Sequence, residues 1–233
     1  CDNLRENGKI LENAFIKYLE LLNDSVLIKW IQKNVSFPSC VVDRITPRVP
    51  DTLSGEIESN FKIKENCSVL SEDFIQWVIE EKFSASFPDV NELTNVDITK
   101  NVIPYEETKI RVLNGGHSCL AYLGALMGLK TFDECFKKEN LDLFFKDLET
   151  KEIIPSLGNN IPFDLTKYLN TIYERFQNSN ISDALERICM DGSSKFPIFV
   201  LPTIKKCFEM NIEPINGITA IASWYVFMSK INN

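Results

Sequence analysis

Residues 104–128 read PYEETKIRVLNGGHSCLAYLGALMG, and this stretch decides the fold class. It is rich in apolar side chains along its whole length, which predicts a central helix that buries most of its circumference. Asn114-Gly115-Gly116 places three poor helix formers inside it, and each glycine there costs about 1 kcal/mol relative to alanine. We therefore expect a ligand or another backbone to approach the helix closely at this point.

Amphipathic segments lie on both sides of this central helix. From Gly8 to Leu22 the apolar residues recur every three or four positions, which predicts a helix with one apolar stripe. The β-branched run 41–46, flanked by prolines, predicts a strand or extended segment. The same patterns predict helices at 24–33, 71–81, 131–138, 141–151, 165–177, 181–189, 198–210 and 218–231, with breaks at Pro155, Pro162, Pro197 and Pro214. The fold class is mainly α, with a small extended or β region.

Composition limits the partners of the chain. Its 233 residues, 44% of them hydrophobic, suffice for one large domain or two small ones. The net charge of -8 removes the phosphate attraction that drives nucleic-acid binding, and the longest apolar run, 218–228, is far shorter than the roughly 18–20 residues that span a membrane. Seven widely spaced cysteines without a Cys-x-x-Cys pair indicate reduced thiols and a cytoplasmic location. The first residues lack an initiator Met, which favours a fragment of a longer protein.

Lys109, Asn114 and His117 form a candidate polar site. His117 is the only histidine, which excludes multi-histidine zinc sites by count, and no carboxylate spacing predicts another metal site. On an α-helix the three residues lie within roughly 140° of one another and can face one cavity. Taken alone, Lys109 could be a solvated surface lysine, Asn114 a local helix irregularity and His117 a buried core histidine. Their combination inside a buried helix favours a functional site.

Arg187 and Lys195 form a second candidate pair, on either side of a turn. Two cations there suit an oxygen-rich ligand, although solvated surface charges are the more ordinary interpretation. No Gly-x-Gly-x-x-Gly occurs, and Gly124-x-x-x-Gly128 is explained by close helix packing. The chain therefore carries no dinucleotide fingerprint.

Five segments, in this order, resemble the long-chain mannitol dehydrogenase family. They are CDNLRENG at 1–8, VDRITP at 42–47, QWV at 76–78, Lys109-x4-Asn114-x2-His117-Ser118, and Met190-Asp191-Gly192-Ser193-x-Lys195. The resemblance covers essentially the whole chain and implies one C-terminal helical domain over 1–233, resembling the C-terminal fold of 6-phosphogluconate dehydrogenase. Ile75 departs from the family, which commonly has arginine there, so one polar contact is expected to be missing.

The family resemblance implies an activity and its cofactor. Family members include mannitol 2-dehydrogenases, arabinitol dehydrogenases and hexuronate reductases, which interconvert a secondary alcohol and a ketone with NAD or NADP and without a metal. The resemblance implies that a Rossmann domain upstream of this chain binds the cofactor, so that no cofactor-binding residue is expected here. It further implies a cytoplasmic monomer that acts on a polyol, ketose or hexuronate.

Site roles follow from the same resemblance. Lys109 is expected to be the general base, while Asn114 and Asn3 donate hydrogen bonds to the developing alkoxide. His117 is expected to orient the substrate. A desolvated lysine with a lowered pKa can take the hydroxyl proton, and two carboxamides can steady the alkoxide without zinc. The substrate hydroxyls are expected to be held by Asp43, Arg187 and Lys195.

Two function classes stay open at the level of sequence. The first is the catalytic half of a polyol dehydrogenase, with mannitol/fructose and mannonate/fructuronate as the leading substrate pairs. The second is a helical binding module that kept the fold and lost the chemistry. We favour the enzyme, because a module without chemistry has little reason to retain a lysine, an asparagine and a histidine on one helical face.

Overall fold

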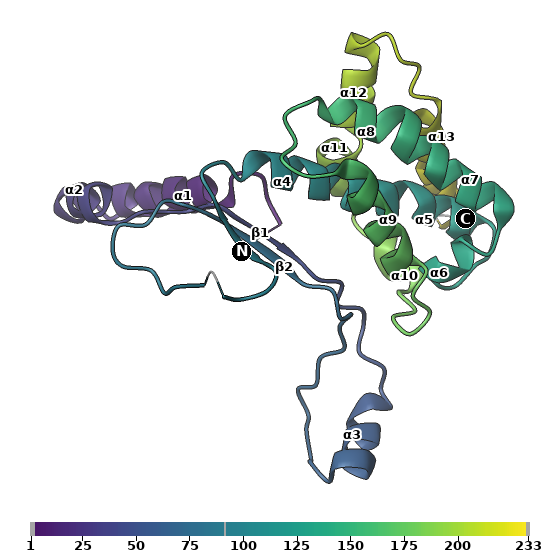
Figure 1. Cartoon of the computed structure of the whole chain (residues 1–233), viewed down its shortest axis with the longest axis horizontal. Helices are drawn as coiled ribbons and strands as arrows, with labels where there is room; N and C mark the ends of the chain where they lie inside the picture. Colours follow the sequence, from purple (N-terminus) through teal and green to yellow (C-terminus); the bar gives the residue numbers. More distant parts are fainter. Residues whose placement is uncertain (1–2, 91, 232–233) are drawn as a thin grey trace. The chain divides into compact units, whose positions relative to one another are not determined.

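The computed structural model describes residues 3–90 and 92–231, which are mainly helical with one small sheet (Figure 1). The chain forms two compact units. Unit 1 comprises Cys1–Arg44 and Phe74–Glu107, and unit 2 comprises Ile45–Asp73 and Thr108–Asn233. The mainly α class is confirmed, whereas the likeness to the C-terminal fold of 6-phosphogluconate dehydrogenase stays a prediction.

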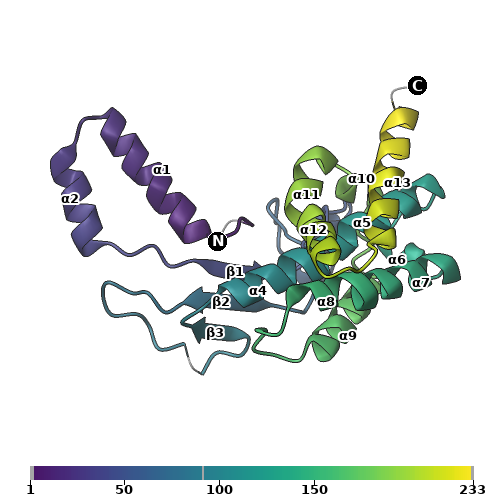
Figure 2. The ribbon, with the colours of Figure 1, turned by 90° about the horizontal axis from the view of Figure 1, so that it is seen from above.

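Unit 1 contains a pair of helices and a three-stranded sheet (Figure 2). Helices α1 (Asn7–Leu21) and α2 (Ser25–Asn34) contact each other and confirm the helices predicted from periodicity. The Asp24 carboxylate caps α2 by accepting a hydrogen bond from the Leu27 N–H at 2.9 Å. The remaining elements are β1 (Cys40–Asp43), β2 (Gln76–Glu80), β3 (Val96–Thr99) and α4 (Ile103–Thr108).

Strand β2 lies within the segment 71–81, for which the sequence predicts a helix. The predicted helix is therefore wrong. It lies between the other two strands, antiparallel to β1 and parallel to β3. Val78 is fully buried and faces Val41 of β1 in the register. A short apolar run fits either a helix or a buried strand, and here hydrogen bonding to strands on both sides decides between them.

Unit 2 is built around α5 (Gly116–Leu126), which packs against α7, α10 and α13 (Figure 2). Leu120 and Tyr122 of α5 are fully buried in its core. The other elements are α3 (Leu53–Phe61), η1 (Lys109–Gly115), α6 (Phe132–Cys135), α7 (Glu139–Asp147), η2 (Leu148–Ile153), α8 (Ile154–Leu157), α9 (Leu165–Phe176), α10 (Leu185–Ile188), α11 (Gly192–Phe199), α12 (Leu201–Glu209) and α13 (Ile215–Ile231). The sequence predicts neither α3 of unit 2 nor β3 of unit 1.

Two of the four predicted proline breaks are wrong. Pro155 is the second residue of α8, which continues directly from η2, so the helical path passes through this proline without a break. Pro197 lies inside α11, which ends two residues later at Phe199. The breaks at Pro162 and Pro214 are confirmed, since both lie in the loops before the next helix.

Candidate functional site

Lys109 and Asn114 lie on the π-helix η1, which joins α4 to α5. The sequence predicts one continuous α-helix here, and the structure corrects this to an α–π–α succession. Because a π-helix bonds residue i to residue i+5, Lys109 and Asn114 lie one turn apart, on the same side. Both side chains are half-buried. The π-turn therefore brings together the predicted base and the predicted amide donor.

Gly115 and Gly116 let two other parts of unit 2 approach this turn. A Cβ on Gly115 would lie 3.0 Å from the carbonyl oxygen of Phe199, and a Cβ on Gly116 would overlap the Glu149 carboxyl group. The expected close approach of another backbone is thereby confirmed at Gly115. The glycines that weaken the helix locally are those that allow α11 and η2 to pack against it.

His117 occupies an aromatic pocket in the first turn of α5. Its ring stacks on Phe176, with centroids 4.9 Å apart, and meets Phe132 edge-on at 4.2 Å. The side chain is only 14% exposed. Burial lowers the pKa of His117 to about 3, although the nearby Asp183 carboxylate opposes this shift. His117 is therefore a neutral imidazole at physiological pH, able both to donate and to accept a hydrogen bond.

Asp183 connects Arg187, one of the predicted substrate-binding residues, to His117. Its carboxylate accepts a 2.8 Å hydrogen bond from Nε of Arg187 and a second one from Nη2 of the same guanidinium. The Asp183 Oδ2 atom lies 3.9 Å from Nε2 of His117. Lys195 donates a 2.9 Å hydrogen bond to the carbonyl oxygen of Ile188, and burial lowers the pKa of Lys195. The structure thus brings Arg187 and His117 together at one buried carboxylate, whereas the Lys195 amine is bonded to a backbone carbonyl oxygen.

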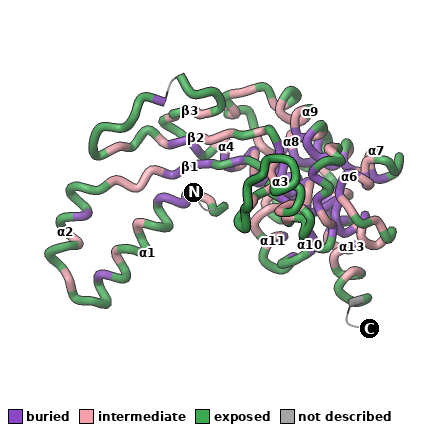
Figure 3. Tube along the Cα trace, turned by 90° about the horizontal axis from the view of Figure 1, so that it is seen from below, coloured by how far each residue is buried: buried purple, intermediate pink, exposed green. Residues whose placement is uncertain are grey.

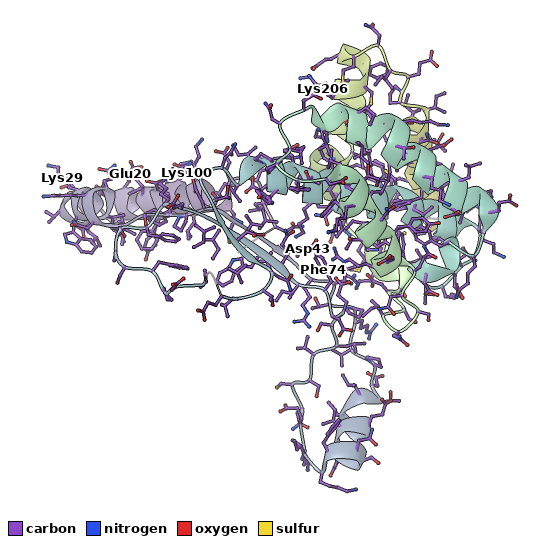
Figure 4. All side chains as sticks on the ribbon, in the orientation of Figure 1. Glu20, Lys29, Asp43, Phe74, Lys100 and Lys206 are labelled. Atoms are coloured by element: carbon purple, nitrogen blue, oxygen red, sulfur yellow. The ribbon has the colours of Figure 1, made fainter. Side chains whose placement is uncertain are left out.

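Asn3 and Asp43 belong to unit 1, whereas the other five predicted site residues belong to unit 2. Asn3 is exposed. Asp43, labelled in Figure 4, is buried at the end of β1, where it pairs in register with Gln76 of β2. The sequence identified both residues through the family motif, and their roles stay predictions.

Several buried charged residues escaped the sequence analysis, among them Asp183, Glu72 and Arg175. Asp183 is four residues before Arg187, a spacing that suits an ion pair on a helix and could have been noticed. Glu72 and Arg175 form a buried ion pair across 103 positions of sequence, and no local pattern could have revealed it. These residues show that the surroundings of the site depend on long-range pairing.

Glu149 is a fully buried carboxyl group on η2 beside Gly116. Neither of its oxygens has a hydrogen-bond partner within the described part of the chain. Burial raises its pKa well above the ordinary value of 4.5, so the group is held as the neutral acid. Such an unsatisfied buried group destabilises the fold by about 1–3 kcal/mol.

Replacing Glu149 with methionine should therefore raise the free energy of unfolding by about 1–3 kcal/mol at neutral pH. Because the unfolded chain loses this proton at a lower pH than the folded chain, the contribution of Glu149 to the free energy of unfolding falls as pH rises above about 4.5. The gain from methionine should shrink below that pH. Urea unfolding across a pH series measures both effects, with Glu149→Gln as a control that keeps the polarity and removes the titration. An equal or lower stability of Glu149→Met at neutral pH would contradict this account.

The residues that could bind a metal are scattered over 3–90 and 92–231. No group of three or more histidine, cysteine, aspartate or glutamate side chains there could hold a metal ion. The six cysteines in these ranges are free thiols. None of the helices found in these ranges is long and apolar enough to cross a membrane.

Fold and site together define a helical protein whose polar centre is carried by a π-turn. The chain belongs to the mannitol dehydrogenase family. Residues 101–233 match the family described as Mannitol dehydrogenase C-terminal domain, and residues 1–92 match the Mannitol dehydrogenase Rossmann domain. The two matches meet between residues 92 and 101. The sequence analysis predicts instead a single C-terminal domain over residues 1–233, and this domain assignment stays a prediction.

Three relatives match nearly the whole of this chain. D-arabinitol 4-dehydrogenase of Ralstonia nicotianae is 40% identical over 92% of this chain and 46% of its own length. The structure of Pseudomonas fluorescens mannitol 2-dehydrogenase in a ternary complex with NAD and D-mannitol is 36% identical, with a TM-score of 0.86 over 97% of this chain and 46% of that one. A substrate-free D-sorbitol dehydrogenase structure is 32% identical, with a TM-score of 0.88 over 98% of this chain and 47% of its own. The chain therefore spans about half the length of its relatives.

Proposed function

We propose that the complete protein interconverts a polyol and its ketose with NAD or NADP, and that Lys109 is the general base. The observation that carries the proposal is the π-helix, on which Lys109 and Asn114 lie one turn apart, and Asn114 precedes the neutral His117 by three residues. The names of the relatives support a polyol as the substrate class.

The side chains of the proposed site suit the oxidation of an alcohol. Lys109 accepts the hydroxyl proton, and Asn114 and Asn3 donate hydrogen bonds to the oxygen as negative charge develops on it. His117 orients the substrate, and Asp43, Arg187 and Lys195 hold its remaining hydroxyls. A bound nicotinamide supplies the acceptor for the hydride of the carbinol carbon. The amine and the carboxamides provide proton acceptance and charge stabilisation, the two functions a catalytic zinc would otherwise supply, so we propose a metal-independent reaction.

An exposed apolar face on unit 1 supports a nucleotide-binding half beyond this chain. Helices α1 and α2 are largely exposed (Figure 3), with Leu21 82%, Val26 78% and Trp30 56% exposed. Large apolar side chains left exposed on neighbouring helices favour an interface with another part of the protein. Since residues 1–92 match a Rossmann-domain family and the relatives are about twice as long, we propose that the rest of that domain covers this face and binds the cofactor.

A hexuronate is the second candidate substrate, since Arg187 and Lys195 could bind its carboxylate. Asp183 already accepts two hydrogen bonds from Arg187 and neutralises its charge. An uncharged polyol needs no free cation and therefore fits this arrangement better. For this reason we propose the polyol as the first candidate substrate and the hexuronate as the second.

The proposed function is tested by assaying the full-length protein with mannitol, arabinitol, sorbitol and mannonate, each with NAD and with NADP. The absorbance of the reduced cofactor reports turnover. Oxidation of at least one polyol, faster than that of mannonate, is the expected result. Faster turnover of mannonate would favour the hexuronate over the polyol as the substrate class. Absence of turnover with all four substrates and both cofactors would favour a helical binding module.

A further inference from the structure

We propose that Asp183 is a positioning residue, which holds the Arg187 guanidinium and the His117 ring in place for the substrate. This inference rests on the proposed function and adds to it a residue to which the family motif assigns no role. Asp183 is 5% exposed and lies between the two side chains. It does not itself need to touch the substrate.

The two hydrogen bonds from Arg187 are the first part of the argument. They run from Nε and Nη2 of one guanidinium to the two oxygens of one carboxylate, the bidentate geometry that fixes the plane of an arginine. The Arg187 side chain is 43% exposed, so without this pairing it would have many rotamers available. Asp183 thus preorganises a side chain that is otherwise free to move into solvent.

The position of His117 is the second part. Phe132 and Phe176 fix the plane of the ring, but aromatic contacts do not select which nitrogen carries the proton. The Asp183 carboxylate lies on the Nε2 side, at 3.9 Å, and its negative charge favours the tautomer with hydrogen on Nε2. A fixed tautomer gives each nitrogen of His117 one defined role towards a hydroxyl group.

The backbone around Asp183 is held independently of its carboxylate. The Asp183 carbonyl oxygen accepts a 2.9 Å hydrogen bond from the Phe132 N–H, and the Leu185 N–H donates to the Lys130 carbonyl oxygen at 3.0 Å. Residues 184 and 131 also form an isolated antiparallel bridge. Asparagine at position 183 should therefore leave the local fold intact, while it removes the charge and replaces one of the two acceptor oxygens with an NH2 donor.

Asp133 offers a matched control for Asp183. It is equally buried at 5% exposure and lines the same small cavity as His117 and Asp183. Its carboxylate, however, is paired with Lys137 and with the Thr131 hydroxyl, at 2.7 and 2.6 Å. Asp133→Asn therefore removes a buried charge from the same cavity without changing the partner of Arg187.

Steady-state kinetics of the full-length Asp183→Asn protein test the proposal. We expect kcat/KM for the polyol to fall by about a hundredfold, mostly through KM, because misplaced binding groups weaken substrate positioning. Asp133→Asn should stay close to the native protein, and in an Arg187→Gln background Asp183→Asn should cause a smaller further loss than it causes alone, because only the part that acts through His117 then remains. Native kinetics for Asp183→Asn, or equal losses in both aspartate variants, would overturn the proposal.

A second measurement does not depend on activity. His117 is the only histidine of this chain, and the loss of its signals in His117→Gln identifies them in a protein of any length. Heteronuclear NMR of the imidazole nitrogens should show one neutral tautomer, protonated at Nε2, in the native protein and in Asp133→Asn, and a mixture of tautomers in Asp183→Asn. An unchanged tautomer in Asp183→Asn would refute the positioning role. If the native protein turns over none of the polyols, the proposed function fails, and the NMR result still decides whether Asp183 orients His117.

Discussion

Replacing Lys109 with alanine should lower kcat/KM of the full-length protein for its polyol by about 10²–10⁴-fold. The Lys109 amine lies on η1 one π-turn before Asn114, and the only other basic side chain of η1, Arg111, stays protonated and cannot accept a proton, so the loss of Lys109 leaves the hydroxyl proton without an acceptor. The loss should appear in kcat, because proton transfer belongs to the transition state and not to substrate binding. Small primary amines added to the Lys109→Ala protein should restore part of the rate.

Lys205→Ala is the matched control, because Lys205 is an exposed lysine of α12 in the same unit. It should have native kinetics and native stability. Should Lys109→Ala retain the native kcat, or should added amines raise the rate of both variants equally, Lys109 would not be the base.

Replacing Glu72 with glutamine should lower the free energy of unfolding of unit 2 by about 3–5 kcal/mol. Nε of Arg175 lies 3.2 and 3.0 Å from the two carboxylate oxygens, and Nη2 lies 2.7 Å from Oε1. The same Oε1 accepts a 2.6 Å hydrogen bond from the Ile45 N–H. Because both side chains are buried, the substitution leaves a guanidinium charge inside the protein without its counter-ion.

The double variant Glu72→Leu/Arg175→Met distinguishes the loss of attraction from the burial of an unpaired charge. Removing both charges should recover most of the stability that Glu72→Gln loses, because neither side chain then needs to be desolvated as an ion. Glu209→Gln, at the exposed pair with Lys206, should change the stability by less than about 1 kcal/mol. Urea unfolding of the three variants gives the comparison; equal losses for Glu72→Gln and the double variant would contradict this explanation.

Local sequence signals were sufficient for most helices of the fold. Helix α1 follows its apolar period, α2 its Asp24 cap, and α9 begins at the Asp164 cap and ends near the predicted residue. These signals act within one or two turns of chain, so they can be recognised without knowledge of the tertiary contacts. The helix predicted for 71–81 failed because its outcome depended on strands β1 and β3, which are distant in sequence.

The candidate site divides in the same way. The residue types at 109, 114 and 117, and the two glycines between them, determined from sequence alone that a polar centre interrupts a buried helix. Only the tertiary structure shows that this interruption is a π-turn, and that the Phe199 carbonyl oxygen and the Glu149 carboxyl group approach the chain there at Gly115 and Gly116. It also decided that Asp183 faces both Arg187 and His117, and that Glu72 meets Arg175. Helix periods and caps are set by neighbours along the chain, whereas the pairing of buried charges is set by desolvation, which depends on what the folded chain places around them.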